Sequence, residues 1–211
     1  MEPFIRSDQY NFIKAQTQVL INGHASAKDV DVLNALKSIA QEKIFNSFVT
    51  MDEEQRQLIA PIEKVEDKHS AEEFLAQLQP YVIPFQITEQ AIKKLFPKAK
   101  KLKTPPLQDM DLRETSYLGW NDPGSSKKFI IAPYKNKQIG IHGSFRAINK
   151  KGICALCNRH EEVGMFIVET KWAGDGTFTK RGNYICQDSQ KCNQNLTTLD
   201  KLTDFIGELK R

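Results

Sequence analysis

Apolar residues recur at helical spacing in the first part of the chain. Over residues 29–48 they lie three or four positions apart, at Leu33, Leu36, Ala40, Ile44 and Phe48. This spacing is typical of a helix with one buried face. An earlier helix is predicted over residues 10–20, so the chain begins with at least two helices.

Two further helix starts are predicted from capping boxes, in which a hydroxyl and an acidic side chain bind the first free backbone amides of a helix. Thr50 with Glu53 and Ser70 with Glu73 have the required spacing. Together with the two periodic segments, they predict an N-terminal bundle of about four helices.

Prolines and charge place a domain boundary near residue 80. Pro80, Pro84 and Pro97 interrupt any continuing helix. Residues 1–80 carry a formal charge of −5 and residues 81–211 a charge of +9, which gives the net +4 of the 211-residue chain. We therefore expect a helical domain over residues 1–80 and a basic domain over residues 81–211. A basic surface favours RNA, a ribosome or an acidic protein as partner.

The second domain alternates between strand-like and turn-like segments. After a short helix over residues 89–96, apolar runs at residues 128–132 and 138–142 flank a polar turn and predict an antiparallel hairpin. Residues 145–148 and 165–170 are expected to add strands. The fold class is therefore α+β, with a helical bundle followed by an α/β domain that contains an antiparallel sheet.

A C-terminal helix is predicted from the helical spacing of Leu199, Leu202, Ile206 and Leu209. Phe205 lies on the flank of this apolar face, since successive residues are rotated by about 100°. We therefore expect the Phe205 ring to be partly exposed, and the helix to pack against the neighbouring cysteine-rich segment.

All four cysteines of the chain lie between residues 154 and 192, as Cys154, Cys157, Cys186 and Cys192. A Cys-x2-Cys turn directs two thiolates to one tetrahedral ion, and a second pair completes a closed structural zinc site with no position for water. The second pair is more widely spaced than is usual. Two disulfides and free buried thiols are the alternatives to zinc.

Disulfides would require an oxidising compartment, which the start of the chain does not favour. Residues 1–8 lack the basic and then apolar pattern of a signal peptide. No window approaches the roughly 20 apolar residues that span a bilayer. We therefore expect a cytoplasmic protein without a membrane partner, and disulfides are rare in the cytosol. The same observation disfavours a secreted adhesin.

The cysteine-rich region has the order of a treble-clef zinc finger, over about residues 150–211. A Cys-x2-Cys turn is followed by two strands with a glycine-containing loop, two more cysteines and a helix. Some such modules hold a nuclease site, which needs a histidine base, and His142 and His160 are the candidates in this half. Neither a Gly-x-Ser-x-Gly elbow nor a glycine-rich phosphate loop occurs. We interpret the protein as a binder and not as an enzyme.

Two basic segments are candidates for binding. Residues 93–103 contain six lysines, which would contact phosphates or form a solvated helix end and linker. Residues 178–186 mix cations with aromatic residues just before Cys186. Arg and Tyr are enriched at interface hot spots, but an ordinary hairpin with Tyr184 packed on the sheet explains this segment equally well.

Five segments resemble, in order, the elongation factor G-binding proteins of the FusB type, which confer fusidic acid resistance: residues 9–13, 81–85, 119–121, 152–157 and 182–192. The resemblance covers nearly the whole chain. It implies a helical bundle joined to an α/β domain that ends in a four-cysteine treble clef. It also implies that the C-terminal domain binds elongation factor G, on or off the ribosome, and promotes its release.

The resemblance implies residue roles as well. The zinc ligands would be Cys154, Cys157, Cys186 and Cys192, and the contacts to elongation factor G would be Ile153, Arg181, Tyr184 and Phe205. Ile153 stands where well-known members have an aromatic residue, and the lost ring stacking, worth roughly 0.5–1.5 kcal/mol, predicts weaker binding. We expect a monomer whose basic half also contacts ribosomal RNA. The alternative function is a zinc-dependent protein that binds the ribosome or structured RNA.

Overall fold

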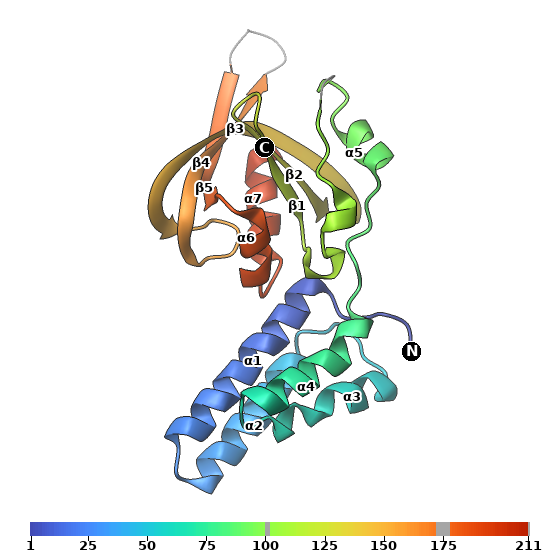
Figure 1. The fold of residues 1–211 in the computed structure, drawn as a ribbon, viewed down its shortest axis with the longest axis vertical. Helices are drawn as coiled ribbons and strands as arrows, with labels where there is room; N and C mark the ends of the chain where they lie inside the picture. The colour runs from blue at the N-terminus through green and yellow to red at the C-terminus, as the bar shows by residue number, and fades with distance from the viewer. Residues whose placement is uncertain (100–101, 172–177, 211) are drawn as a thin grey trace. The chain divides into compact units, whose positions relative to one another are not determined.

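The computed structural model describes residues 1–99, 102–171 and 178–210 (Figure 1). The chain forms two compact units, Met1–Ile83 and Pro84–Arg211. Each unit has its own hydrophobic core. Within the described residues, no helix is long and apolar enough to cross a membrane.

The first unit is built from helices, as its apolar periodicity predicts. Its α-helices are α1 Ser7–Ser26, α2 Val30–Phe45, α3 Glu53–Ile59 and α4 Lys68–Leu78, and 3-10 helices follow at Ala60–Lys64 and Gln79–Tyr81. The helices predicted over residues 10–20 and 29–48 are confirmed as α1 and α2. Helix α1 is longer than predicted at both ends. The buried faces of the helices meet in a core that includes Ile13, Leu20, Ile44, Ile59 and Leu78.

Both capping boxes lie at other positions than predicted. Helix α3 begins after Asp52, whose carboxylate accepts a hydrogen bond from the Gln55 backbone N–H at 2.8 Å, while the Gln55 side chain accepts one from the Asp52 N–H at 3.1 Å. Helix α4 begins after Asp67, whose carboxylate accepts from the Ser70 N–H at 2.8 Å. The predicted caps Thr50 and Ser70 are wrong, because a nearby aspartate offers a charged and stronger acceptor.

The second unit is a five-stranded antiparallel sheet with helices packed on it (Figure 1). Its strands are β1 Leu118–Asp122, β2 Lys127–Tyr134, β3 Lys137–Ile153, β4 His160–Lys171 and β5 Phe178–Cys186, which are neighbours in this order. Its helices are α5 Glu89–Leu95, α6 Ser189–Asn195 and α7 Asp200–Lys210, with 3-10 helices at Leu107–Asp109 and Leu112–Glu114. Strands β1 and β5 therefore form the edges of the sheet.

The predicted hairpin is confirmed as β2 and β3. Lys135 and Asn136 form its turn, with φ of 48° and 61°. Positive φ values at both positions suit the twist of a two-residue hairpin. The separate strand expected over residues 145–148 is wrong, because those residues continue β3. A bulge between Ala147 and Lys150 lets this long strand bend without ending.

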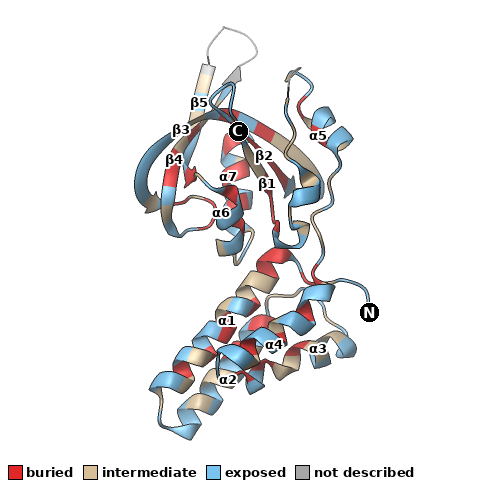
Figure 2. Cartoon of the chain, in the orientation of Figure 1, coloured by how far each residue is buried: buried red, intermediate tan, exposed pale blue. Residues whose placement is uncertain are grey.

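Strand β2 shows that the sheet is covered on both faces. Phe129 and Ile131 pack with Phe96 on the face that α5 covers, whereas Ile130 and Ala132 belong to the core beneath α6 and α7. Alternate side chains of a strand point to opposite faces, so a strand covered on both faces reads as a continuous apolar run. Buried residues accordingly lie along the sheet and on α6 and α7 (Figure 2).

Phe205 of α7 is 4% exposed and is therefore not the partly exposed ring that its helical position predicts. The sheet curves around α7, which contacts both β2 and β5 (Figure 1). The sheet consequently covers a larger part of the circumference of α7 than the leucine and isoleucine positions of the helix indicate. The Phe205 ring packs near that of Phe166 in β4, with 6.1 Å between the ring centroids.

Candidate metal centre and partner surface

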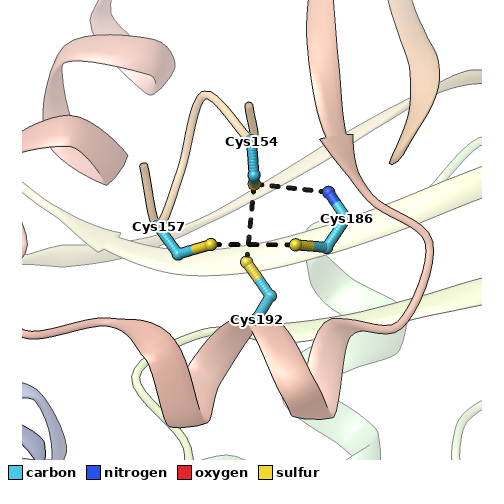
Figure 3. A group of neighbouring side chains, drawn as sticks. All are labelled: Cys154, Cys157, Cys186 and Cys192. Carbon is cyan, nitrogen blue, oxygen red and sulfur yellow. Dashed lines mark hydrogen bonds between the residues drawn. The ribbon is translucent and has the colours of Figure 1, made fainter. Parts of the chain in front are cut away.

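Four cysteine side chains meet beside α6, although they come from separate segments. Cys154 and Cys157 lie in the turn between β3 and β4, Cys186 ends β5, and Cys192 lies in α6. All four are buried, and their sulfurs lie within 4.8 Å of one another (Figure 3). Elsewhere in the described part of the chain, no group of three or more His, Cys, Asp or Glu side chains is placed to share a metal ion.

The spacing of the sulfurs matches a tetrahedral metal site. The Sγ atoms of Cys154 and Cys192 are 3.8 Å apart, and those of Cys157 and Cys186 are 3.7 Å apart. A regular tetrahedron with Zn–S bonds of about 2.3 Å has edges of about 3.8 Å. A disulfide would bring two sulfurs to about 2.05 Å, and all four cysteines are free thiols. The donor set therefore fits a metal ion and does not fit the disulfide alternative.

The turn that carries Cys154 is arranged around its sulfur. The backbone N–H groups of Leu156 and Cys186 point at this sulfur from 3.4 and 3.3 Å. Asn158 closes the turn at a φ of 55° and donates its N–H to the Cys154 carbonyl at 2.9 Å. Hydrogen bonds from the neighbouring thiols, that of Cys157 first, lower the pKa of Cys154. These donors stabilise a thiolate, which is the form that binds a metal.

The hydroxyl of Tyr117 is buried in the same core, close to Cys192 and Ser189, and makes no hydrogen bond of standard geometry to a described residue. Its pKa is raised, mainly by burial and then by the charge of Cys192 and Cys154. A buried hydroxyl without a partner costs free energy, whereas a hydroxyl beside a thiolate can donate to it. The position of Tyr117 thus also fits a cluster of anionic sulfurs.

Lys128 brings an ammonium group to this region. The residue is 1% exposed, and its Nζ donates to the Gln187 carbonyl at 2.9 Å and lies 4.9 Å from the centre of the Phe145 ring. Burial lowers the pKa of Lys128 to about 8, while the negative charge of Cys192 acts in the opposite direction. Four thiolates with one divalent ion carry two negative charges, so a buried cation nearby offsets part of that charge.

Helix α6 is fixed in place by Asn193, which follows Cys192. The Asn193 Oδ1 accepts hydrogen bonds from the backbone N–H groups of Ser116 and Tyr117 at 2.8 and 3.0 Å, and its Nδ2 donates to the Tyr117 carbonyl at 2.9 Å. At the start of the helix, the Asp188 carboxylate caps the free backbone amides. The fourth sulfur is therefore held by hydrogen bonds as well as by packing.

Sequence reasoning missed Tyr117, Lys128 and Asn193. Burial of Lys128 could have been predicted from the apolar run over residues 128–132, because a strand that is covered on both faces also buries its lysine. Nothing local marks Tyr117 or Asn193, which meet across 76 positions of sequence. Of the candidate histidines, His142 is exposed but packs by the Phe129 ring, with 5.5 Å between centroids, and the partial desolvation there lowers its pKa.

Two of the residues assigned to partner contact are exposed beside the metal centre. Ile153, which directly precedes Cys154, is 59% exposed, and Tyr184 on β5 is 42% exposed. The Ala155 N–H donates to the Tyr184 carbonyl at 2.8 Å, which joins the cysteine turn to the edge strand. Strand β5 does pair antiparallel with β4, but Tyr184 is not packed away from solvent.

The other two assigned residues lie where α7 meets β5. The Arg181 guanidinium donates to the Glu208 carbonyl at 2.7 Å. Arg181 and Phe205 line one hollow of about 500 Å³, together with Lys180, Gly182, Asn183, Glu208 and Leu209. The structure therefore brings Arg181 and Phe205 to one hollow, where Arg181 is partly exposed and Phe205 is buried.

The lysine-rich segment over residues 93–103 is only partly described. Lys93 and Lys94 lie in the last turn of α5, where cations suit the negative end of the helix. Lys100, Lys101 and the glycine-containing loop over residues 172–177 lie outside the described residues. Lys93 and Lys94 therefore match the interpretation of this segment as a helix end.

Comparison with known proteins gives two family matches and a related structure. Residues 4–86 match the family described as "Elongation factor G-binding protein, N-terminal", and residues 92–206 match "FBP C-terminal treble-clef zinc-finger". A solved structure, "Structure of the fusidic acid resistance protein FusC", is 32% identical over 97% of this chain and 97% of that chain, with a TM-score of 0.84. No curated protein sequence matches.

Proposed function

Because the chain belongs to the family of elongation factor G-binding proteins with a C-terminal treble-clef zinc finger, we propose that it binds elongation factor G and promotes release of that factor from the ribosome. This action would protect translation from fusidic acid. The observation that carries the proposal is the exposed pair Ile153 and Tyr184 beside a buried four-cysteine centre. The similarity to a fusidic acid resistance protein over 97% of the chain supports it further.

Zinc is the ion that we propose for the centre, with Cys154, Cys157, Cys186 and Cys192 as its ligands. Four thiolates close the coordination sphere of zinc, so the ion would stabilise the fold and would supply no reactive water. Ile153 is adjacent to one ligand and Tyr184 lies two residues before another. A bound ion would therefore fix the backbone that presents both side chains to a partner.

The proposed contact surface combines apolar area with a positive charge. Ile153 and Tyr184 offer exposed apolar surface, and Arg181 has further N–H donors beyond the one bound to Glu208. Such donors would pair with a carboxylate on the factor. Phe205 is buried, so we assign it to holding α7 against the sheet and to lining the Arg181 hollow.

Release of the factor requires a difference in affinity between two of its conformations. A protein that binds elongation factor G best in a shape that fits the ribosome poorly would shift the factor toward that shape. A coupling free energy of about 1–3 kcal/mol would weaken the hold of the ribosome by about 5–150-fold. The protein would act as a monomer in the cytoplasm, where its partner works.

The release step is tested on ribosomes stalled with fluorescently labelled elongation factor G and fusidic acid. Stopped-flow mixing with the native chain should speed dissociation of the factor, and the Tyr184→Ala variant should not. Val49→Ala is the control, since Val49 is exposed on the helical unit. Equal dissociation rates with and without the chain would overturn the release proposal, while binding to the free factor is measured separately.

A further inference from the structure

A second hollow lies at the tip of the β2–β3 hairpin, beside the last turn of α7. It has a volume of about 640 Å³, and its lining consists of Tyr134, Lys135, Lys137, Ile139, Gly207 and Lys210. Half of these residues are lysines and none is acidic. The hollow shares no lining residue with the one formed by Arg181 and Phe205.

Two ammonium groups gather on the Tyr134 ring from distant parts of the chain. The Nζ atom of Lys135, in the hairpin turn, lies 5.4 Å from the ring centre, and that of Lys210, at the end of α7, lies 5.5 Å from it. Lys137 pairs directly with Tyr134 across the hairpin. The ring itself is half-buried against the domain core, so it provides a fixed support for these cations.

No ion pair within the part of the chain that the structure describes offsets the positive charge of this hollow. Among the described residues, neither Lys135, Lys137 nor Lys210 forms an ion pair, whereas Lys180 pairs with Glu169 at 2.9 Å and Lys191 with Glu161 at 2.7 Å. Like charges around one ring repel each other, and an anion that enters between them relieves the repulsion.

We propose that this hollow binds phosphate groups of RNA. Lysine carries a compact charge that suits phosphate, and displacement of counterions from a phosphate backbone supplies affinity. An aromatic ring among such cations is the combination found where single-stranded nucleic acid binds. Carboxylates of an acidic protein are matched best by the planar fork of arginine, and no arginine among the described residues lines this hollow.

The site goes beyond the proposed function and does not rest on it. Residues of α7 line both hollows, Gly207 and Lys210 the one and Glu208 and Leu209 the other. One helix end could therefore contact a protein partner where it meets β5 and RNA where it meets β2.

Binding of a fluorescein-labelled single-stranded RNA of about 20 nucleotides, followed by anisotropy at several salt concentrations, tests the proposal. The triple variant Lys135→Gln, Lys137→Gln and Lys210→Gln should bind at least about tenfold more weakly than the native chain. Its plot of log affinity against log salt should lose about 2 units of slope, since each phosphate contact of a single strand contributes about 0.7.

A matched control removes three exposed lysines from the helical unit, as Lys14→Gln, Lys28→Gln and Lys64→Gln. It should bind RNA as the native chain does, and all variants should keep the native melting temperature. Equal weakening in both triple variants, or native affinity in the first, would overturn the proposal. It would also be overturned if polyglutamate of equal charge displaced the RNA as effectively as unlabelled RNA does, because the ligand would then be an acidic protein.

Discussion

Asn193 hydrogen-bonds both the backbone N–H and the backbone carbonyl of Tyr117, at 3.0 and 2.9 Å. Through this pairing α6, which carries Cys192, is tied to the segment that leads into β1. The same segment places the Tyr117 hydroxyl against the sulfurs. The candidate metal centre is therefore held by residues well outside the cysteine-rich region, and changes to these residues should alter metal affinity.

Replacing Asn193 by alanine should destabilise the second unit. The change leaves the buried N–H groups of Ser116 and Tyr117 without their acceptor, so we expect the free energy of unfolding to fall by about 2–4 kcal/mol. Urea unfolding followed by circular dichroism measures the difference. The neighbouring and exposed Gln194→Ala should change stability by less than about 0.5 kcal/mol. Similar losses in both variants would contradict this role of Asn193.

Tyr117→Phe should weaken metal binding without disturbing the packing. The variant keeps the ring and removes only the hydroxyl that lies beside the thiolates, so we expect about tenfold weaker zinc affinity. Competition with a chromogenic chelator measures this affinity. Tyr184→Phe, which removes an exposed hydroxyl, should bind zinc as the native chain does. Unchanged affinity in Tyr117→Phe would mean that the hydroxyl does not donate to a sulfur.

Lys128→Met should lower zinc affinity without lowering the stability of the metal-free protein. Methionine fills a similar space without the cation, so the negative charge of the zinc-bound centre loses its buried counter-charge and zinc affinity should fall about tenfold. The metal-free protein should be no less stable, because a buried charge is no longer required. Chelator competition and thermal unfolding give the two quantities, with the exposed Lys127→Met as control. Loss of stability without loss of zinc affinity would contradict the prediction.

His142 should make stability depend on pH. Partial desolvation, and then the charge of Lys127, lower its pKa in the folded protein, so the unfolded chain takes up the proton first. Stability should therefore fall as the pH decreases below about 6.5, the ordinary histidine value. Urea unfolding at pH 7 and pH 5 should show a smaller fall in His142→Gln than in the native chain. His69→Gln, in the exposed pair with Glu73, is the control, and equal falls in all three proteins would contradict the assignment.

Segments with regular apolar spacing, and segments bounded by turn residues, could be predicted well from the sequence. The helices around Leu33 and Leu202 and the hairpin closed by Lys135 depend on local spacing and on local turn geometry. The grouping of the four cysteines could also be predicted. Four cysteines in one short segment usually share a metal ion.

Features that depend on distant contacts could not be predicted. The exposure of Phe205 was misjudged because the curvature of the sheet around α7 is not a property of the helix sequence. The pairing of Asn193 with Tyr117 joins residues 76 positions apart. The caps at Asp52 and Asp67 were missed for a different reason, since two overlapping capping patterns compete and the sequence contains both.

We propose that the edge strand beside the metal centre docks elongation factor G. Calorimetric titration of the native chain into the purified factor should give one-to-one binding, and Arg181→Ala with Tyr184→Ala should bind at least about 100-fold more weakly, as for loss of interface hot spots. Phe205 is left unchanged because its removal would open a cavity in the core, and Val49→Ala should bind normally. Equal affinity of the double variant and the native chain would contradict docking at this strand.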